Sequence, residues 1–245
     1  EYGVFEIKAE YENEGSRDTE LMRLKDIASR VDLPIILKIG GVEAVTDMYS
    51  ALTLGTKGIV APMAETAFAA SKFLDAINTF IAEDNQKDIE FAINIETITA
   101  YHNIDEILAL KKLDILKSIT IGRVDFTASM GKDRTFANSD EMLEMCTDIF
   151  KKCRDKGLRT AVGGAVSPES KEFLTTLVSQ KLIDKYETRK TVYEASAINT
   201  IDEGLKAGIL FELLWLKSKR RYYHRIKGED EKRIAMLETR IGENP

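Results

Sequence analysis

The sequence is poor in several residue types, and each scarcity excludes a class of protein. Its 245 residues include only 4 prolines, 2 cysteines and 2 histidines. So few prolines argue against long Pro-rich linkers, and so few histidines exclude His-rich metal chemistry such as zinc hydrolysis. No stretch approaches the roughly 18 consecutive apolar residues of a membrane span. The remaining composition, 44% hydrophobic and 31% charged, is typical of one large globular domain.

The cysteines and the first residues bear on where the protein works. Cys146 and Cys153 lie seven apart in a helical pattern, which separates them by about 10 Å of helical rise, too far for a disulfide. We expect reduced thiols in a cytoplasmic protein. The first residues, Glu1 to Phe5, show no charged leader followed by an apolar centre, so we expect no secretory signal. The chain lacks an initiator Met, which predicts residues upstream.

The charge distribution limits the partners. A net charge of −6 argues against polyanionic partners such as nucleic acid. One segment is an exception, because residues 217–225 read KSKRRYYHR. We interpret this segment as a solvated helix end or a subunit contact rather than a nucleic-acid site. The expected partners are therefore a small-molecule substrate and further copies of the chain, with no membrane or nucleic acid.

Short β-branched runs alternate with longer amphipathic segments along the chain. The predicted strands are residues 3–9, 34–39, 57–61, 89–95, 117–122, 158–162 and 190–195. The predicted helices are residues 18–31, 42–54, 65–82, 99–111, 140–156, 168–180 and 201–217. Gly55 and Gly157 mark helix ends, while Ser139 and Ser167-Pro168 mark helix starts.

Seven such βα units in series predict a parallel sheet covered by helices. At about 250 residues the natural closed form is a TIM (β/α)8 barrel. An open doubly wound sheet is the alternative, but no Gly-rich phosphate fingerprint follows the first strand. The count is one strand short of eight, so we expect the missing strand upstream of Glu1. We predict one barrel domain over residues 1–245, in which 218–245 form a charged helical tail.

Two acidic residues follow apolar strands at places where a carboxylate has no packing role. Glu96 ends Ile93-Asn94-Ile95-Glu96, and Asp125 follows Ile119-Thr120-Ile121-Gly122. The carboxyl ends of barrel strands meet at one face, so both carboxylates should converge there. Two carboxylates that leave room for water and a bidentate oxo acid suit Mg²⁺. The alternative is that each acid merely caps the helix that follows it.

Four blocks, in order and at similar spacing, resemble the HpcH/HpaI aldolase and citrate lyase β-subunit family. These are residues 34–38 (PIILK), 55–63 (GTKGIVAPM), 93–97 (INIET) and 121–131 (IGRVDFTASMG). The resemblance covers about residues 3–165. It implies a TIM barrel of the phosphoenolpyruvate/pyruvate type. It also implies Mg²⁺ or Mn²⁺ held by one Glu and one Asp, and C–C bond cleavage or formation beside a 2-oxo acid or acyl thioester.

The resemblance assigns roles by position. Glu96 and Asp125 would be the metal ligands, and backbone N–H groups around Val124 and Asp125 would face the substrate carboxylate. The family arginine that neutralises the enolate falls near Lys38. A Lys that reaches solvent or pairs with an acid is the plainer interpretation of Lys38, and a Schiff base is the rival chemical use.

The chain also departs from the family. The family carries an acidic residue followed by His after the first matching strand, whereas the matching place reads Ala9-Glu10-Tyr11-Glu12, with Tyr where His would be. We expect Glu10 and Tyr11 to supply proton transfer, although a solvated charge cluster is the alternative. Arg123 replaces the usual Pro before the metal Asp. The altered residues make a standard hydroxy-diacid aldolase doubtful.

Other polar residues complete the predicted site. We expect Arg123, Val124, Glu12 and Arg17 to bind substrate, since an Arg fork suits carboxylates and phosphates. The loop 131–135 is either a lid or an ordinary connection. His102 is expected in a surface or capping role, and His224 is expected at the surface.

These observations predict a divalent-metal-dependent carbon–carbon lyase or aldolase that acts on a 2-oxo acid through a pyruvate enolate. An acyl-CoA or citryl lyase-like enzyme, or one that uses phosphoenolpyruvate, is the alternative within enzymes. A barrel that has lost catalysis and serves as a binding or assembly subunit is the alternative from another class, and Tyr11 favours it.

Overall fold

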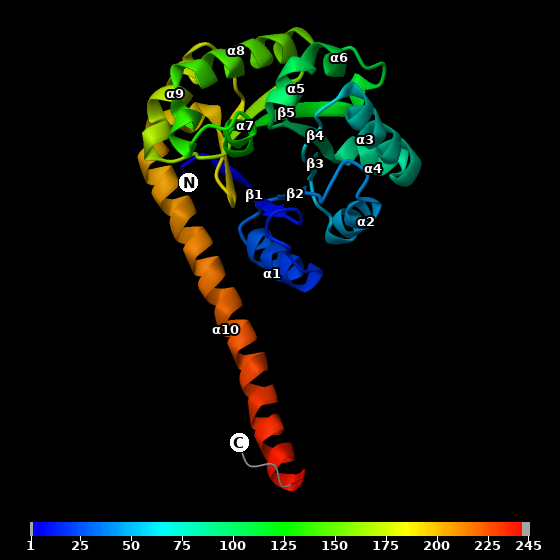
Figure 1. The fold of residues 1–245 in the computed structure, drawn as a ribbon, viewed down its shortest axis with the longest axis vertical. Coiled ribbons are helices and arrows are strands. Elements are labelled where there is room, and N and C mark those ends of the chain that lie inside the picture. Colours follow the sequence, from blue (N-terminus) through cyan, green and yellow to red (C-terminus); the bar gives the residue numbers. More distant parts are fainter. Residues whose placement is uncertain (1, 242–245) are drawn as a thin grey trace. The chain divides into compact units, whose positions relative to one another are not determined.

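The computed structural model describes residues 2–241, and eight strands in it close into a barrel in sequence order (Figure 1). The strands are β1 (Val4–Glu10), β2 (Ile35–Lys38), β3 (Gly58–Ala61), β4 (Glu90–Ile95), β5 (Leu116–Gly122), β6 (Arg159–Gly163), β7 (Lys185–Glu187) and β8 (Thr191–Glu194). The predicted TIM-type barrel is confirmed. Each neighbouring pair from β1 to β7 is parallel, so the carboxyl ends of these strands share one end of the barrel.

The last strand closes the barrel in an unexpected direction. β8 runs antiparallel to both of its neighbours, β7 and β1. The predicted strand 190–195 is therefore real, but it is the return arm of a hairpin and not a parallel βα unit. β7 was not predicted from the sequence, because a strand of only three residues gives no clear pattern. With β8 in the eighth place, the barrel closes without the strand that we expected upstream of Glu1.

Helices surround the strands on the outside of the barrel (Figure 1). They are α1 (Asp18–Ser29), α2 (Val45–Leu54), α3 (Ala67–Phe80), α4 (Glu83–Asp88), α5 (Ile98–His102), α6 (Ile104–Leu108), α7 (Arg123–Ser129), α8 (Asp140–Asp155) and α9 (Lys171–Ser179). Short 3₁₀ turns occur at Leu113–Ile115, Arg134–Asn138, Pro168–Ser170 and Ala195–Thr200. No helix in the described part of the chain is both long and apolar enough to cross a membrane.

The predicted helix signals largely hold. Gly55 ends α2 in the left-handed region at φ +62°, and Ser139 Oγ accepts the Met142 N–H at 3.2 Å to cap α8. The predicted helix 99–111 is instead broken into α5 and α6 at Asn103. The side-chain amide of Asn103 donates to the Glu65 carbonyl at 2.9 Å, a long-range contact that no local pattern shows.

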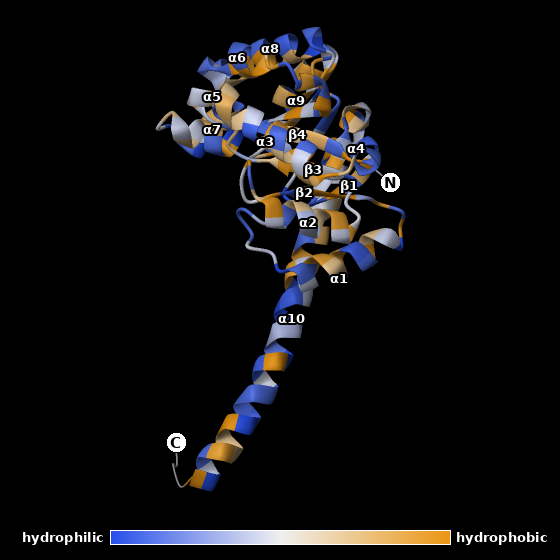
Figure 2. Cartoon of the chain, turned by 90° about the vertical axis from the view of Figure 1, so that its right-hand side faces the viewer, coloured by the Kyte–Doolittle hydropathy of each residue, from blue (hydrophilic) through white to orange (hydrophobic). Residues whose placement is uncertain are grey.

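The core has two layers. Between strands and helices lies an apolar layer, whose fully buried members include Leu37, Phe73, Ile93, Ile121 and Phe150. In Figure 2, hydrophobic residues are orange along the strands and helices of the barrel. Both cysteines are free and buried in α8, as their spacing predicts. The interior of the barrel is polar by comparison. It is lined by Ile36, Gly58, Val60, Glu90, Ala92, Ser118, Thr120, Lys185 and Glu187.

The chain divides into two compact units, one up to Lys206 and one from Ala207. The first unit contains the barrel. The second consists, within the described residues, of the greater part of α10 (Ile201–Ile241). The predicted tail from residue 218 is thus a continuation of the predicted helix 201–217.

Candidate active site

The Glu96 carboxylate lies at the carboxyl end of the barrel and is held from three sides. Glu96 follows β4 directly and is 2% exposed. Its Oε1 accepts the Met63 N–H at 3.0 Å, and its Oε2 accepts the Asn94 amide at 3.0 Å. Lys38 Nζ donates to the same Oε2 at 3.4 Å. These contacts fix the carboxylate and offset its burial, because a buried charge must be paired and hydrogen-bonded.

The end of β5 is shaped around this carboxylate. A Cβ on Gly122 would lie 2.5 Å from Glu96 Oε2, so only glycine lets β5 pass so close. Asp125 follows three residues later in the first turn of α7 and is half-buried. The side chain of Asp125 has no hydrogen-bond or ion-pair partner within residues 2–241. The chain therefore places a second, uncommitted carboxylate in the turn that begins beside Glu96.

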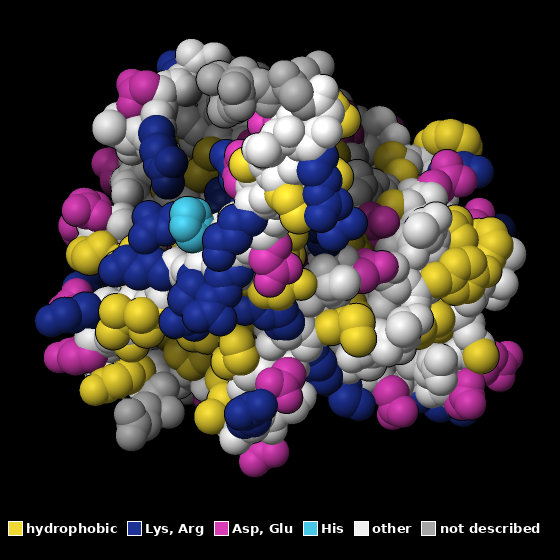
Figure 3. All heavy atoms as spheres, turned by 90° about the horizontal axis from the view of Figure 1, so that it is seen from below, with side chains coloured by type: hydrophobic (Ala, Val, Ile, Leu, Met, Phe, Trp, Pro, Cys, Tyr) yellow, Lys and Arg dark blue, Asp and Glu magenta, His cyan; other side chains and the backbone are white. Residues whose placement is uncertain are grey.

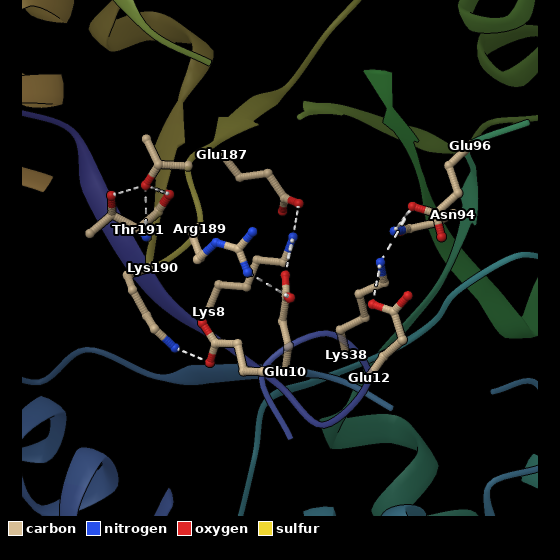
Figure 4. A network of polar contacts seen from close by, with 12 residues as sticks. Lys8, Glu10, Glu12, Lys38, Asn94, Glu96, Glu187, Arg189, Lys190 and Thr191 are labelled. Atoms are coloured by element: carbon tan, nitrogen blue, oxygen red, sulfur yellow. Dashed lines mark hydrogen bonds and ion pairs between the residues drawn. The ribbon is translucent and has the colours of Figure 1, made fainter. Parts of the chain in front are cut away.

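Lys38 links the acidic residues on this side of the barrel. It ends β2, is 5% exposed, and lies between Glu96 and Glu12, whose Oε2 is 3.1 Å from Nζ. The Glu12 side chain is 26% exposed, so it borders solvent while Lys38 does not. The structure thus groups Lys38 with Glu12 and Glu96, three residues that the sequence analysis assigned to the site (Figure 4).

This set of donors fits a divalent cation of the Mg²⁺ type. Glu96 and Asp125 offer hard carboxylate oxygens, the ligands that Mg²⁺ prefers. Asn94 donates its amide hydrogens to Glu96, and its buried Oδ1 has no partner in the described residues. No group of three or more His, Cys, Asp or Glu gathers anywhere in the described part of the chain. Mg²⁺ is commonly held by one or two protein carboxylates, with water or substrate at its other positions.

A second charged group lies across the barrel mouth (Figure 4). Lys8 Nζ donates to Glu187 Oε1 and lies 3.3 Å from Glu10 Oε1. Burial opposes the charged form of Lys8, but Glu187 and Glu10 outweigh it and raise its pKa. Burial likewise works against ionised Glu10, yet Lys8 and Lys38 together hold its pKa below the usual range. Glu10 is therefore a stable, buried anion.

Arg189 is the exposed cation of this second group. It lies in the turn between β7 and β8, at the same end of the barrel. Its Nη1 is 3.8 Å from Glu10 Oε2, and its side chain is 45% exposed. The neighbouring Lys190 is only 2% exposed and donates to Glu14. Because Lys8, Lys38 and Lys190 are buried and paired, Arg189 is the cation of this cluster that a ligand can reach.

Two expected site residues face elsewhere. The Tyr11 hydroxyl donates to Asp18, at the start of α1. Burial and the Asp18 carboxylate raise the pKa of Tyr11 to about 12, so it is protonated at neutral pH. Arg17 precedes α1, where its Nη1 lies 3.6 Å from Glu20. The Tyr11 backbone N–H does donate to the Lys38 carbonyl at 2.9 Å, so Tyr11 meets Lys38 through the main chain while its hydroxyl faces Asp18.

Arg123 is fully buried, and its guanidinium holds loops together. It donates to the carbonyls of Ala137 at 2.9 Å and Gly164 at 2.8 Å and to Asn138 Oδ1 at 2.8 Å. The guanidinium also lies 4.5 Å from the ring centre of Phe173. Burial lowers the pKa of Arg123 to about 10. This geometry favours a structural role over the substrate contact that we expected.

The backbone around Val124 is closely approached from β6. A Cβ on Gly164, which has φ +73°, would lie 2.7 Å from the backbone nitrogens of Arg123 and Val124. The glycine therefore leaves space at these N–H groups that any other residue would fill. The expected lid at 131–135 leads into a 3₁₀ turn, where Asp133 Oδ1 accepts the Thr135 N–H at 2.8 Å.

Several site residues were missed by the sequence analysis, although some had a signal. Glu6, Lys8 and Glu10 alternate along β1, which places three charged side chains on one face of a buried strand. Asn94 precedes Glu96 by two residues and so shares its face. Glu187 and Arg189 had no signal, because their position depends on the β7–β8 hairpin.

Comparisons with known proteins agree with this architecture. A search of curated protein sequences finds no match. Among solved structures, the citrate synthase SbnG is 16% identical with a TM-score of 0.61, over 87% of this chain and 83% of that one. An HpcH/HpaI aldolase from Desulfitobacterium hafniense DCB-2 is 14% identical with a TM-score of 0.60, over 82% of each chain.

The citrate lyase beta subunit of M. tuberculosis, solved with oxaloacetate and magnesium, is 13% identical with a TM-score of 0.51, over 80% of this chain and 84% of that one. At identities this low, the structural likeness shows a shared barrel fold alone. The family description rests on the sequence itself. A family model matches residues 30–173, a segment that holds Lys38, Glu96 and Asp125. The chain belongs to the HpcH/HpaI aldolase/citrate lyase family.

Proposed function

We propose that this protein is a divalent-metal-dependent carbon–carbon lyase or aldolase that acts on a 2-oxo acid through its enolate. The observation that carries the proposal is the placement of Lys38. Its ammonium lies between a buried carboxylate, Glu96, and a solvent-bordering one, Glu12. A fixed cation beside two carboxylates can stabilise negative charge that develops on a bound oxo acid.

Each residue has a role in this proposal. Glu96 and Asp125 would hold the metal, which when bound polarises the ketone and stabilises negative charge. Lys38 neutralises the enolate oxygen, and the N–H groups of Val124 and Asp125 receive the substrate carboxylate. Glu12 is the preferred proton-transfer residue, because it borders solvent beside Lys38. Glu10 is held ionised by Lys8, and Tyr11 has a pKa of about 12, so neither suits the task as well.

The proposal is tested by solvent exchange of pyruvate methyl protons, followed by proton NMR in D₂O. The intact chain with Mg²⁺ or Mn²⁺ is expected to exchange these protons, and a chelator is expected to stop the exchange. Formation of the enolate alone suffices for exchange, so the second substrate need not be known. No exchange together with no metal binding by calorimetry would contradict the proposal and favour a non-catalytic binding or assembly barrel.

Arg189 is expected to recognise a second acidic group of the substrate. Arg189→Ala should weaken the binding of oxaloacetate about tenfold, since hydrogen bonds to charged groups contribute roughly 1.5–3 kcal/mol. The binding of pyruvate, which has one carboxylate, should change less than about twofold on the same scale. Calorimetry with Mg²⁺ present measures both. Arg30→Ala, which removes an exposed arginine that pairs with Asp26, is the matched control.

Equal effects of Arg189→Ala on both acids would contradict this assignment. An affinity for oxaloacetate that Arg189→Ala leaves unchanged would also contradict the assignment of Arg189. Neither result bears on the proposed enolate chemistry. An acyl thioester substrate is distinguished separately, because citryl- or acyl-CoA would then compete with pyruvate for the site.

A further inference from the structure

The second unit carries an apolar stripe along one side of α10. Positions separated alternately by three and four residues share one face of a helix and form a heptad pattern. Over the last 26 residues of α10 this face consists of Leu216, Arg220, Tyr223, Lys227, Asp230, Ile234, Leu237 and Ile241. The stripe is apolar at both ends and polar in the middle.

The apolar members of the stripe are exposed to solvent. The exposed fraction is 51% for Leu216, 48% for Ile234, 43% for Leu237 and 70% for Ile241. In Figure 2, orange bands of hydrophobic residues interrupt the blue, hydrophilic stretches of α10. Helices in water gain most of their stability from packing an apolar face, so a stripe of this length calls for a partner.

The polar members decide which arrangement of two copies is compatible. In a parallel pair each stripe residue meets its own copy. Arg220 would then face Arg220, Lys227 would face Lys227, and Asp230 would face Asp230. Three layers of like charge in the seam are strongly unfavourable. An antiparallel pair avoids all three.

We propose that α10 pairs with α10 of a second copy of this chain in an antiparallel coiled coil centred between Gly228 and Glu229. In this register the two central layers join Lys227 to Asp230 of the other copy. The layers outside them join Tyr223 to Ile234, Arg220 to Leu237, and Leu216 to Ile241. Both polar residues at the centre meet opposite charge, and apolar residues meet at the ends. The overlap of 26 residues is about 39 Å long at helical rise.

The residues that flank the seam support the same register. On one edge, Lys217 lies opposite Glu238 and His224 lies opposite Glu231, so each acidic residue faces a Lys or His side chain. On the other edge, Lys219 lies opposite Arg240, the one unfavourable couple, and Ile226 lies opposite Arg233. By two-fold symmetry each couple occurs twice. The two residues of each couple are too far apart along one helix to touch. They can meet only between two helices, and the antiparallel arrangement brings them together.

The basic stretch of α10 raises the competing occupant, an anionic membrane surface. Figure 3 shows Lys and Arg side chains gathered around a histidine on one face of the molecule. Six of the residues between 217 and 227 are Lys or Arg. However, this segment is followed by Glu229, Asp230 and Glu231, which an anionic surface would repel and which a second copy accommodates. A second copy is therefore the better match.

Disulfide cross-linking of the full chain tests the register. Arg220→Cys and Leu237→Cys chains, mixed and oxidised, are expected to give a cross-linked dimer on a non-reducing gel, while either variant alone is not. Cys146 and Cys153 are buried and should not compete. Arg225→Cys mixed with Lys232→Cys is the matched control, since these residues lie at the same height on the opposite face. The proposal would be overturned if either seam variant cross-linked with itself. It would also be overturned if the mixture of Arg220→Cys and Leu237→Cys gave no cross-linked dimer.

A charge exchange provides an independent readout. Lys217→Glu alone should weaken self-association in sedimentation equilibrium about three- to tenfold, and Lys217→Glu/Glu238→Lys should restore it, on the usual scale of exposed ion pairs. Circular dichroism confirms that each variant remains helical. Restoration would support the antiparallel pairing. Equal weakening by the single and double variants, or association only with anionic vesicles, would contradict it.

Discussion

Glu96→Gln is expected to abolish metal-dependent exchange of pyruvate protons, with a rate at least about 10³-fold below that of the wild type. The amide keeps the size of the side chain and can still accept the Met63 N–H. It removes the negative charge that the proposed cation requires. It also replaces one acceptor oxygen by an NH₂ group, so that a donor would face the donors of Lys38 and Asn94. Proton NMR in D₂O measures exchange, and calorimetry measures the accompanying loss of Mg²⁺ binding.

Asp125→Asn should produce a comparable loss, because the proposal assigns both carboxylates to the same ion. Glu43→Gln is the matched control, since Glu43 is exposed in the loop after β2 and pairs with Lys72. It should leave the exchange rate unchanged. If Glu96→Gln kept both metal binding and exchange while folding normally, Glu96 would not be a ligand and the site would have to be sought elsewhere.

Lys8→Met is expected to reduce the free energy of unfolding by about 3–5 kcal/mol, the usual loss when one partner of a buried ion pair is removed. Methionine fills similar space, so the loss is electrostatic rather than a cavity effect. Glu187 and Glu10, which are 4% and 6% exposed, would be left without their main cation. Denaturant unfolding monitored by circular dichroism measures the change.

The pH dependence of the Lys8→Met loss has a definite sign. The wild type holds the pKa of Glu10 below its usual range, so this contribution to stability is present above about pH 4.3 and is lost as pH falls through the lower folded pKa. Without Lys8, burial favours the protonated carboxyl. The difference between variant and wild type should therefore shrink as pH falls from 7 towards 4.

Two controls isolate the ion pair. Lys8→Met/Glu187→Leu should recover at least half of the loss, because a buried pair replaced by apolar residues is often neutral. Arg30→Met, which breaks an exposed pair with Asp26, should cost less than about 1 kcal/mol. A Lys8→Met variant as stable as the wild type would show that water reaches this part of the barrel.

The sequence was most informative where local pattern and position in a strand suffice. Strands β4 and β5 are short, apolar and flanked by turn signals, and the carboxyl ends of neighbouring parallel strands must share one end of a barrel. Hence Glu96, Lys38 and Glu12 could be predicted to lie together, and the structure places them in contact. The metal that they are proposed to hold stays a prediction.

The directions in which individual side chains point could not be predicted from the sequence. The sequence places Tyr11 between Glu10 and Glu12 but does not show that its hydroxyl meets Asp18 instead of the barrel mouth. Arg123 directly precedes the proposed site in sequence, yet its guanidinium is surrounded by carbonyls from residues 137 and 164. Both outcomes depend on loops that approach from elsewhere in the chain.

The sequence by itself determined the barrel class, the family and the strand ends that carry Glu96 and Asp125, because periodicity and short motifs are local properties. Only the tertiary structure decided how the barrel closes and which charges meet inside it. β8 runs antiparallel and brings Arg189 to the mouth, and Lys8 meets Glu187 across 179 residues of sequence. A three-residue strand and a buried ion pair derive their stability from distant partners, so no local pattern predicts them.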